Sequence, residues 1–178
     1  MGNSTMALVF IIAFAIGIGL TALILRTSTV DKSMKGDYDE RQYIQRLKSE
    51  RNGYRAFIAW VAVLVVLSAA EIEIPADDVV IYASALFVGA GAMAITGIWN
   101  EGYWGNNFNK KRFLTIMSII TVFNIVLPII SITEGKFFVD GKLQFPAISL
   151  MFGILFIIID IETLIRDAID KKADKEED

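Results

Sequence analysis

Residues 6–25 read MALVFIIAFAIGIGLTALIL, and this stretch holds only apolar residues, glycine and one threonine before Arg26. As an α-helix, a run of about 20 such residues is long enough to cross the hydrocarbon core of a bilayer. Comparable runs recur four more times along the chain. We therefore predict a single all-α integral membrane domain over residues 1–178, a bundle of five transmembrane helices. The predicted spans cover residues 5–25, 55–72, 79–99, 113–133 and 145–165.

The composition supports this fold class and excludes many functions. Hydrophobic residues make up 54% of the chain, which leaves too little polar surface for a soluble globule of this size. Cysteine and histidine are both absent, which excludes disulfides, metal or haem sites built on these residues, and Ser-His-Asp catalysis. The basic residues lie in short segments between apolar runs, so we expect no nucleic-acid partner. We also expect no cofactor, no metal and no enzymatic activity.

The distribution of basic residues predicts the orientation of the chain. With five spans, one side of the membrane holds fifteen of the 17 Lys and Arg residues, and the other side holds only Lys136 and Lys142. Cytoplasmic loops of membrane proteins are enriched in Lys and Arg. We therefore expect a multi-pass protein of the cell membrane with its amino terminus outside and its carboxyl terminus in the cytoplasm. The charged tail over residues 167–178 is then cytoplasmic.

Small residues at four-residue spacing predict where helices pack closely, because lipid gives helices little hydrophobic drive to associate. In the third span these residues are Ala85, Gly89 and Gly97, and in the first span they are Ala13 and Gly17. Such faces serve either packing within the bundle or contact with another subunit.

The fourth predicted span carries a polar stripe of Ser118, Thr121 and Asn124, followed by Pro128. Proline cannot donate to the helix ladder, so we expect a kink there. The stripe could line a solute path, or it could form hydrogen bonds between helices inside the bundle.

Asp160 is the most deeply placed acid of the chain, and an ionisable group within a span is a candidate functional site. Arg166 follows about two turns later, so we expect Asp160 at the cytoplasmic interface, free or paired with a basic residue such as Lys110, Lys111 or Arg112. The alternative is a proton- or cation-linked carboxylate that faces the bundle interior near the polar stripe. Glu162 is spaced to pair with Arg166 one turn on.

Residues 37–54 read as a charged cytoplasmic helix before the second span. Asp37 or Asp39 can cap its start, and Arg46 lies four residues before Glu50. This composition suits a helix that lies on the anionic cytoplasmic leaflet or continues into the second span, and it also suits a solvated helical extension.

Within this helix, the segment Asp39-Glu40-Arg41-x-x-Ile44 precedes the Ala56-Phe57 that opens an apolar span. It resembles the D-E-R-x-x-I segment of small archaeal and bacterial multi-span membrane proteins of unknown function. The resemblance implies a typically four-helix bundle with this motif on the cytoplasmic side of a helix pair. The fifth predicted span departs from that pattern, and the resemblance implies no activity.

Two loops have recognisable patterns. Asp140-Gly141 between apolar runs is typical of a tight β-hairpin, which we place on the outer side. The segment 100–109, rich in aromatic residues, Gly and Asn, predicts an ordered turn anchored in the membrane interface.

Three classes of function remain. The first is a non-catalytic membrane protein that acts through helix–helix contacts, as an accessory subunit, a regulator or an immunity-type factor. The second is a small transporter or channel component that uses Asp160 and the polar stripe. The third, an intramembrane enzyme, needs paired catalytic carboxylates, whereas Asp160 and Glu162 point about 200° apart on a helix. We expect the first class, with the lipid bilayer and a membrane protein partner or a second copy as its contacts.

Overall fold

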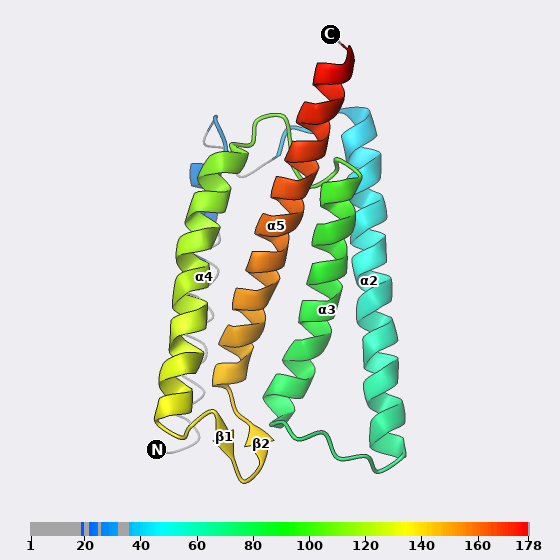
Figure 1. Cartoon of the computed structure of the whole chain (residues 1–178). Helices are drawn as coiled ribbons and strands as arrows, with labels where there is room; N and C mark the ends of the chain where they lie inside the picture. The colour runs from blue at the N-terminus through cyan, green and yellow to red at the C-terminus, as the bar shows by residue number, and fades with distance from the viewer. Residues whose placement is uncertain (1–18, 20–21, 25, 32–35, 178) are drawn as a thin grey trace.

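The computed structural model describes residues 19, 22–24, 26–31 and 36–177, with side chains up to residue 173. The all-helical prediction is confirmed: four long helices account for most of the described chain (Figure 1). These four are long and apolar enough to cross a membrane. The predicted first span, 5–25, lies outside the described residues apart from residues 19 and 22–24, and so do Ala13 and Gly17. The helices are α2 (Glu40–Ala69), α3 (Asp78–Trp99), α4 (Lys110–Thr133) and α5 (Pro146–Glu177).

The four helices pack as neighbours in the order α2, α3, α5, α4 (Figure 1). Helix α5 therefore contacts both α3 and α4, while α2 packs on α3 at the other side of the bundle. The short hairpin of β1 (Phe138–Val139) and β2 (Lys142–Leu143) lies at one end, which we name the hairpin end. The loop 100–109 and the start of α4 lie at the opposite end, which we name the charged end.

The hairpin forms as the sequence predicts, because Asp140 and Gly141 supply the turn. Both residues have positive φ, 51° and 77° respectively, as a two-residue type I′ connection requires. Leu143 then pairs with the segment between α2 and α3, since its amide donates to Pro75 O at 2.9 Å and its carbonyl accepts from Asp77 N at 2.8 Å. A small core at this end is built from Ala76, Val80, Phe137 and Ala147.

Helix α2 is one continuous helix of 30 residues, about 45 Å long. It begins at Glu40 because Asp39 forms a capping box with Gln42: Asp39 Oδ1 accepts from Gln42 N at 2.7 Å, and Asp39 N donates to Gln42 Oε1 at 3.2 Å. The expected charged helix and the expected second span are therefore a single element. Of the arrangements predicted for residues 37–54, a separate helix lying on the leaflet is wrong, and continuation into the span is observed.

Helices α2 and α3 approach closely at two glycines. A β carbon on Gly53 would come within 2.8 Å of Gly89 O, and one on Gly89 within 3.2 Å of Gly53 O. Only residues without a β carbon permit this approach. About two turns from Gly53 toward the hairpin end, Trp60 Nε1 donates to Ser84 Oγ at 2.8 Å and fixes the register of the two helices.

Candidate functional site

A cavity lined by several charged residues lies at the charged end, where α4, α5 and the loop 100–109 meet. It has a volume of about 690 Å³, within the usual range of ligand pockets. We name it the charged-end pocket. Among the residues that line it are Glu101, Trp104, Lys110, Thr163, Arg166, Asp167 and Asp170.

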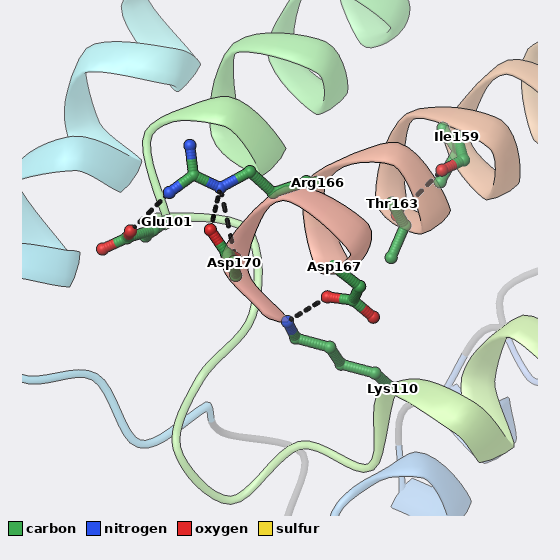
Figure 2. A network of polar contacts seen from close by, with 7 residues as sticks. All are labelled: Glu101, Lys110, Ile159, Thr163, Arg166, Asp167 and Asp170. Carbon is green, nitrogen blue, oxygen red and sulfur yellow. Dashed lines mark hydrogen bonds and ion pairs between the residues drawn. The ribbon is translucent and has the colours of Figure 1, made fainter. Parts of the chain in front are cut away.

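Glu101 holds one wall of this pocket by accepting two guanidinium groups. Arg166 of α5 lies 2.8 Å and Arg41 of α2 lies 3.1 Å from its carboxylate oxygens, so one side chain links three parts of the fold. Arg166 also reaches Asp170 at 3.0 Å, one turn further along α5 (Figure 2). Glu101 has φ 62°, a conformation that non-glycine residues rarely adopt. With this backbone conformation, the Glu101 carboxylate contacts both Arg41 and Arg166.

The opposite wall is formed by the start of α4 and by α5. Lys110 Nζ lies 3.1 Å from Asp167 Oδ1 (Figure 2). Thr163, which is 1% exposed, donates from Oγ1 to Ile159 O at 2.8 Å, so its hydroxyl is satisfied within α5. The two cations of the pocket are therefore both neutralised by carboxylates of the pocket itself. This arrangement joins α2, α4, α5 and the loop 100–109 through ion pairs.

The loop 100–109 is ordered by an aromatic cluster and by backbone pairing. The rings of Tyr103, Phe108 and Phe113 surround Trp104 with centroid distances of 4.6 to 5.3 Å. Burial, with the nearby Tyr38 and Asp160 adding to the effect, raises the pKa of Tyr103 to about 12. The loop also forms backbone hydrogen bonds with the segment that precedes α2. Val30 N donates to Asn107 O, Asn109 N donates to Ser28 O, and Asn106 N donates to Asp37 O.

Asp160 lies between α5 and α4, beside the first residue of the polar stripe. Ser118 Oγ donates to Asp160 Oδ2 at 3.0 Å, while Asp160 Oδ1 is buried and has no hydrogen-bond partner. None of the ion pairs among the described residues includes Asp160. The expected pairing of Asp160 with a basic residue is therefore wrong, since Lys110 pairs with Asp167 instead, and the contact with Ser118 is the one that the alternative expectation named. The reason is reach: Lys110 is level with Asp167, two turns of α5 beyond Asp160.

The other two residues of the stripe bond to their own helix. Thr121 Oγ1 donates to Met117 O at 2.9 Å, and Asn124 Nδ2 donates to Ile120 O at 2.9 Å. Pro128 is fully buried in the bundle. The Thr121 hydroxyl and the Asn124 amide nitrogen therefore both donate within α4.

The three small residues predicted to form the packing face of α3 are all buried. Ala85 is 3% exposed, Gly89 faces Gly53 and Phe57, and Gly97 lies next to Tyr103 and Ser49. Their contacts are within the chain.

The residues of the D-E-R-x-x-I motif have separate structural roles. Asp39 caps α2, Glu40 is its first residue, and Arg41 pairs with Glu101. Ile44 is exposed. The predicted pair of Glu162 with Arg166 is wrong, because Glu162 accepts from Trp99 Nε1 at 2.7 Å while Arg166 binds Glu101 and Asp170.

Sequence reasoning missed three residues that organise this end of the fold: Gly53, Glu101 and Thr163. Gly53 lies four residues after Ser49, a small-residue spacing that could have been found. Glu101 stands in a loop, and nothing in the local sequence indicates its partners.

Comparisons with protein-family models, with curated proteins and with solved structures found no match. The resemblance of the D-E-R-x-x-I segment therefore stays a prediction.

Proposed function

We propose that the chain is a non-catalytic multi-pass protein of the cell membrane that acts through helix contacts with another membrane protein, as an accessory subunit, a regulator or an immunity-type factor. The observation that carries this proposal is the bonding of the polar groups within the helices. Thr121 and Asn124 are bonded to carbonyls of their own helix, and Ser118 is bonded to Asp160. The Ser118–Asp160 bond joins α4 to α5, and the other two side chains donate within α4, which supports a structural role for the stripe over a solute path.

Among the described residues, the apolar outer faces of α2 and α4 offer surfaces for a partner helix. Val66 on α2 and Phe123 on α4 are each 65% exposed. The small-residue seam of α3 is occupied by α2, so a partner contacts larger side chains. We place the charged end in the cytoplasm, because it gathers Arg41, Lys110 and Arg166, and cytoplasmic segments are enriched in cations.

Photo-crosslinking in native membranes tests this proposal. A photoreactive residue is placed at position 66 or 123, with position 142 in the exposed hairpin as the matched control. We expect one discrete crosslinked species from an apolar face, and its mass distinguishes a second copy from a different protein. Native mass spectrometry in mild detergent should show the same species. Crosslinks to lipid alone at both faces, together with a monomeric mass, would contradict the proposal.

A second candidate function rests on Asp160. Its Oδ1 is buried without a partner next to the Ser118 contact, and an acid so placed can bind a proton or a cation. This supports a small transporter or channel component, and the substitution described in the Discussion separates the two candidates.

A further inference from the structure

Helix α2 carries three exposed cations on the face opposite its contact with α3. Lys48, Arg51 and Arg55 lie at i, i+3 and i+7, so they share one side of the helix. Arg51 and Gly53 are two residues apart, about 200° around the helix axis. Because Gly53 packs against α3, the side chains of this basic stripe point away from the bundle.

The contacts between α2 and α3 determine how deep the basic stripe lies. Phe57 is level with Gly89, Gly53 with Met93, and Ser49 with Gly97. Trp99 is the last residue of α3 and serves as the reference for depth. Arg55 is level with residue 91 of α3, about 12 Å along the helix axis from Trp99. Arg51 is level with residue 95, about 6 Å from Trp99.

At that depth the neighbouring helix is apolar. Helix α3 has no charged residue from Val79 to Trp99. The apolar part of α2 that follows Arg55, residues 56–69, spans only about 21 Å, less than the roughly 30 Å of a hydrocarbon core. The guanidinium groups of the basic stripe must therefore extend toward headgroups, or polar groups must come in to meet them.

No carboxylate of the described chain neutralises the basic stripe. The ion pairs among the described residues include none of its three cations. The nearest acid on the same helix, Glu50, is already paired with Arg46 at 2.9 Å. A second copy packed symmetrically on this face would set cations against cations, which is unfavourable.

We propose that Lys48, Arg51 and Arg55 form a binding site for the phosphate groups of anionic phospholipids. The bound phosphate groups lie closer to the bilayer centre than those of the surrounding lipid. Guanidinium groups bind phosphate in a bidentate manner, and the headgroup of phosphatidylglycerol carries no ammonium group that would repel the three cations. Tyr54, 67% exposed beside Arg55, supplies the amphipathic ring typical of the headgroup level. The apolar Ile58, about one turn from Arg55 toward the hairpin end, is exposed and suits contact with acyl chains.

Native mass spectrometry of the full chain tests this site by titration with phosphatidylglycerol and with phosphatidylcholine of the same acyl composition. Three proteins are compared: the unaltered chain, R51Q/R55Q, and the control K111Q/R112Q, which removes the same charge from the start of α4. We expect R51Q/R55Q to weaken phosphatidylglycerol binding by about 30-fold and the control by less than about 3-fold. Equal loss in both variants, or equal binding of the two lipids by the unaltered chain, would overturn the proposal.

A second measurement does not depend on the folding of R51Q/R55Q. The chain has no cysteine, so Tyr54→Cys gives a single labelling position for a fluorophore. In mixed bilayers we expect phosphatidylglycerol that carries a quencher to reduce this fluorescence more than the equivalent phosphatidylcholine, with the difference lost at high salt. Equal quenching by the two lipids, or protection of the label by a protein partner, would contradict a lipid site.

Discussion

Gly53 of α2 and Gly89 of α3 lie back to back, and each would place a β carbon against the carbonyl oxygen of the other. This contact sets the register of the two helices. It therefore determines the height of the charged half of α2 beside α3, and with it the contact of Arg41 with the loop 100–109.

Substitution of Gly53 by alanine should destabilise the protein. The new β carbon would meet Met93 Cβ at 2.7 Å and Gly89 O at 2.8 Å, so the helices must separate. We expect a loss of about 1–3 kcal/mol in the free energy of unfolding, measured by thermal unfolding in mild detergent. Gly91→Ala is the matched control, because its nearest neighbour would be Leu155 Cδ1 at 3.4 Å, an ordinary contact. An equal effect of both substitutions would show that the seam is not tight.

Glu101→Gln should weaken the charged end. The variant keeps the size of the side chain and removes the charge that pairs with both Arg41 and Arg166. Because these groups are partly exposed, we expect a loss of only about 1 kcal/mol in the free energy of unfolding. Glu134→Gln, which removes the local pair with Lys136, is the control and should have a smaller effect. If the two variants unfold alike, Glu101 does not link the three parts of the fold.

Tyr103 should make the fold sensitive to alkaline pH. Burial raises its pKa from 10.0 to about 12, so the folded state retains the phenol proton more tightly than the unfolded chain. This contribution to stability is complete below pH 10 and is lost as the pH rises toward 12, by up to about 3 kcal/mol. We expect Tyr103→Phe to reduce this alkaline loss and Tyr82→Phe, at a residue 71% exposed, to leave it unchanged. The measurement is thermal unfolding from pH 9 to pH 12. Identical curves for the two variants would contradict a buried phenol.

How far the sequence predicts the fold depends on the length of each apolar run. The predicted spans 79–99 and 113–133 lie within three residues of the observed helices, α3 at Asp78–Trp99 and α4 at Lys110–Thr133. The agreement is close because charged or polar residues bound both apolar runs. For α2 and α5 the helices continue far beyond the apolar segments, since helix propensity and capping extend a helix without hydropathy.

The candidate site was less predictable, because it depends on contacts between distant segments. Arg166 had an acid within one turn on either side, Glu162 and Asp170, and it selects Asp170 together with Glu101 from another element. Local spacing allows all of these pairs, and only the packing of the loop 100–109 decides among them. Asp160 illustrates the same point, since its bond to Ser118 depends on the register of α4 against α5.

Asp160→Asn separates the two candidate functions. The amide can still accept from Ser118 Oγ through its oxygen, so the contact between α4 and α5 should persist. For a non-catalytic protein that acts through helix contacts, we expect unchanged thermal unfolding and no change in proton or cation flux in reconstituted vesicles. Ser118→Ala is the companion variant that removes the contact and keeps the acid. A flux that is present in the unaltered chain and lost in Asp160→Asn, with intact folding, favours the transporter.

The placement of the two ends of the bundle across the membrane is the most direct test of the account, since both the cytoplasmic charged end and the lipid site depend on it. Because the chain contains no cysteine, Lys171→Cys, near the end of α5, and Lys142→Cys in the hairpin each give one site for a membrane-impermeant thiol reagent. In intact cells we predict labelling at position 142 and none at position 171 until the membrane is opened. Labelling of position 171 from outside, or of both positions from the same side, would contradict the account.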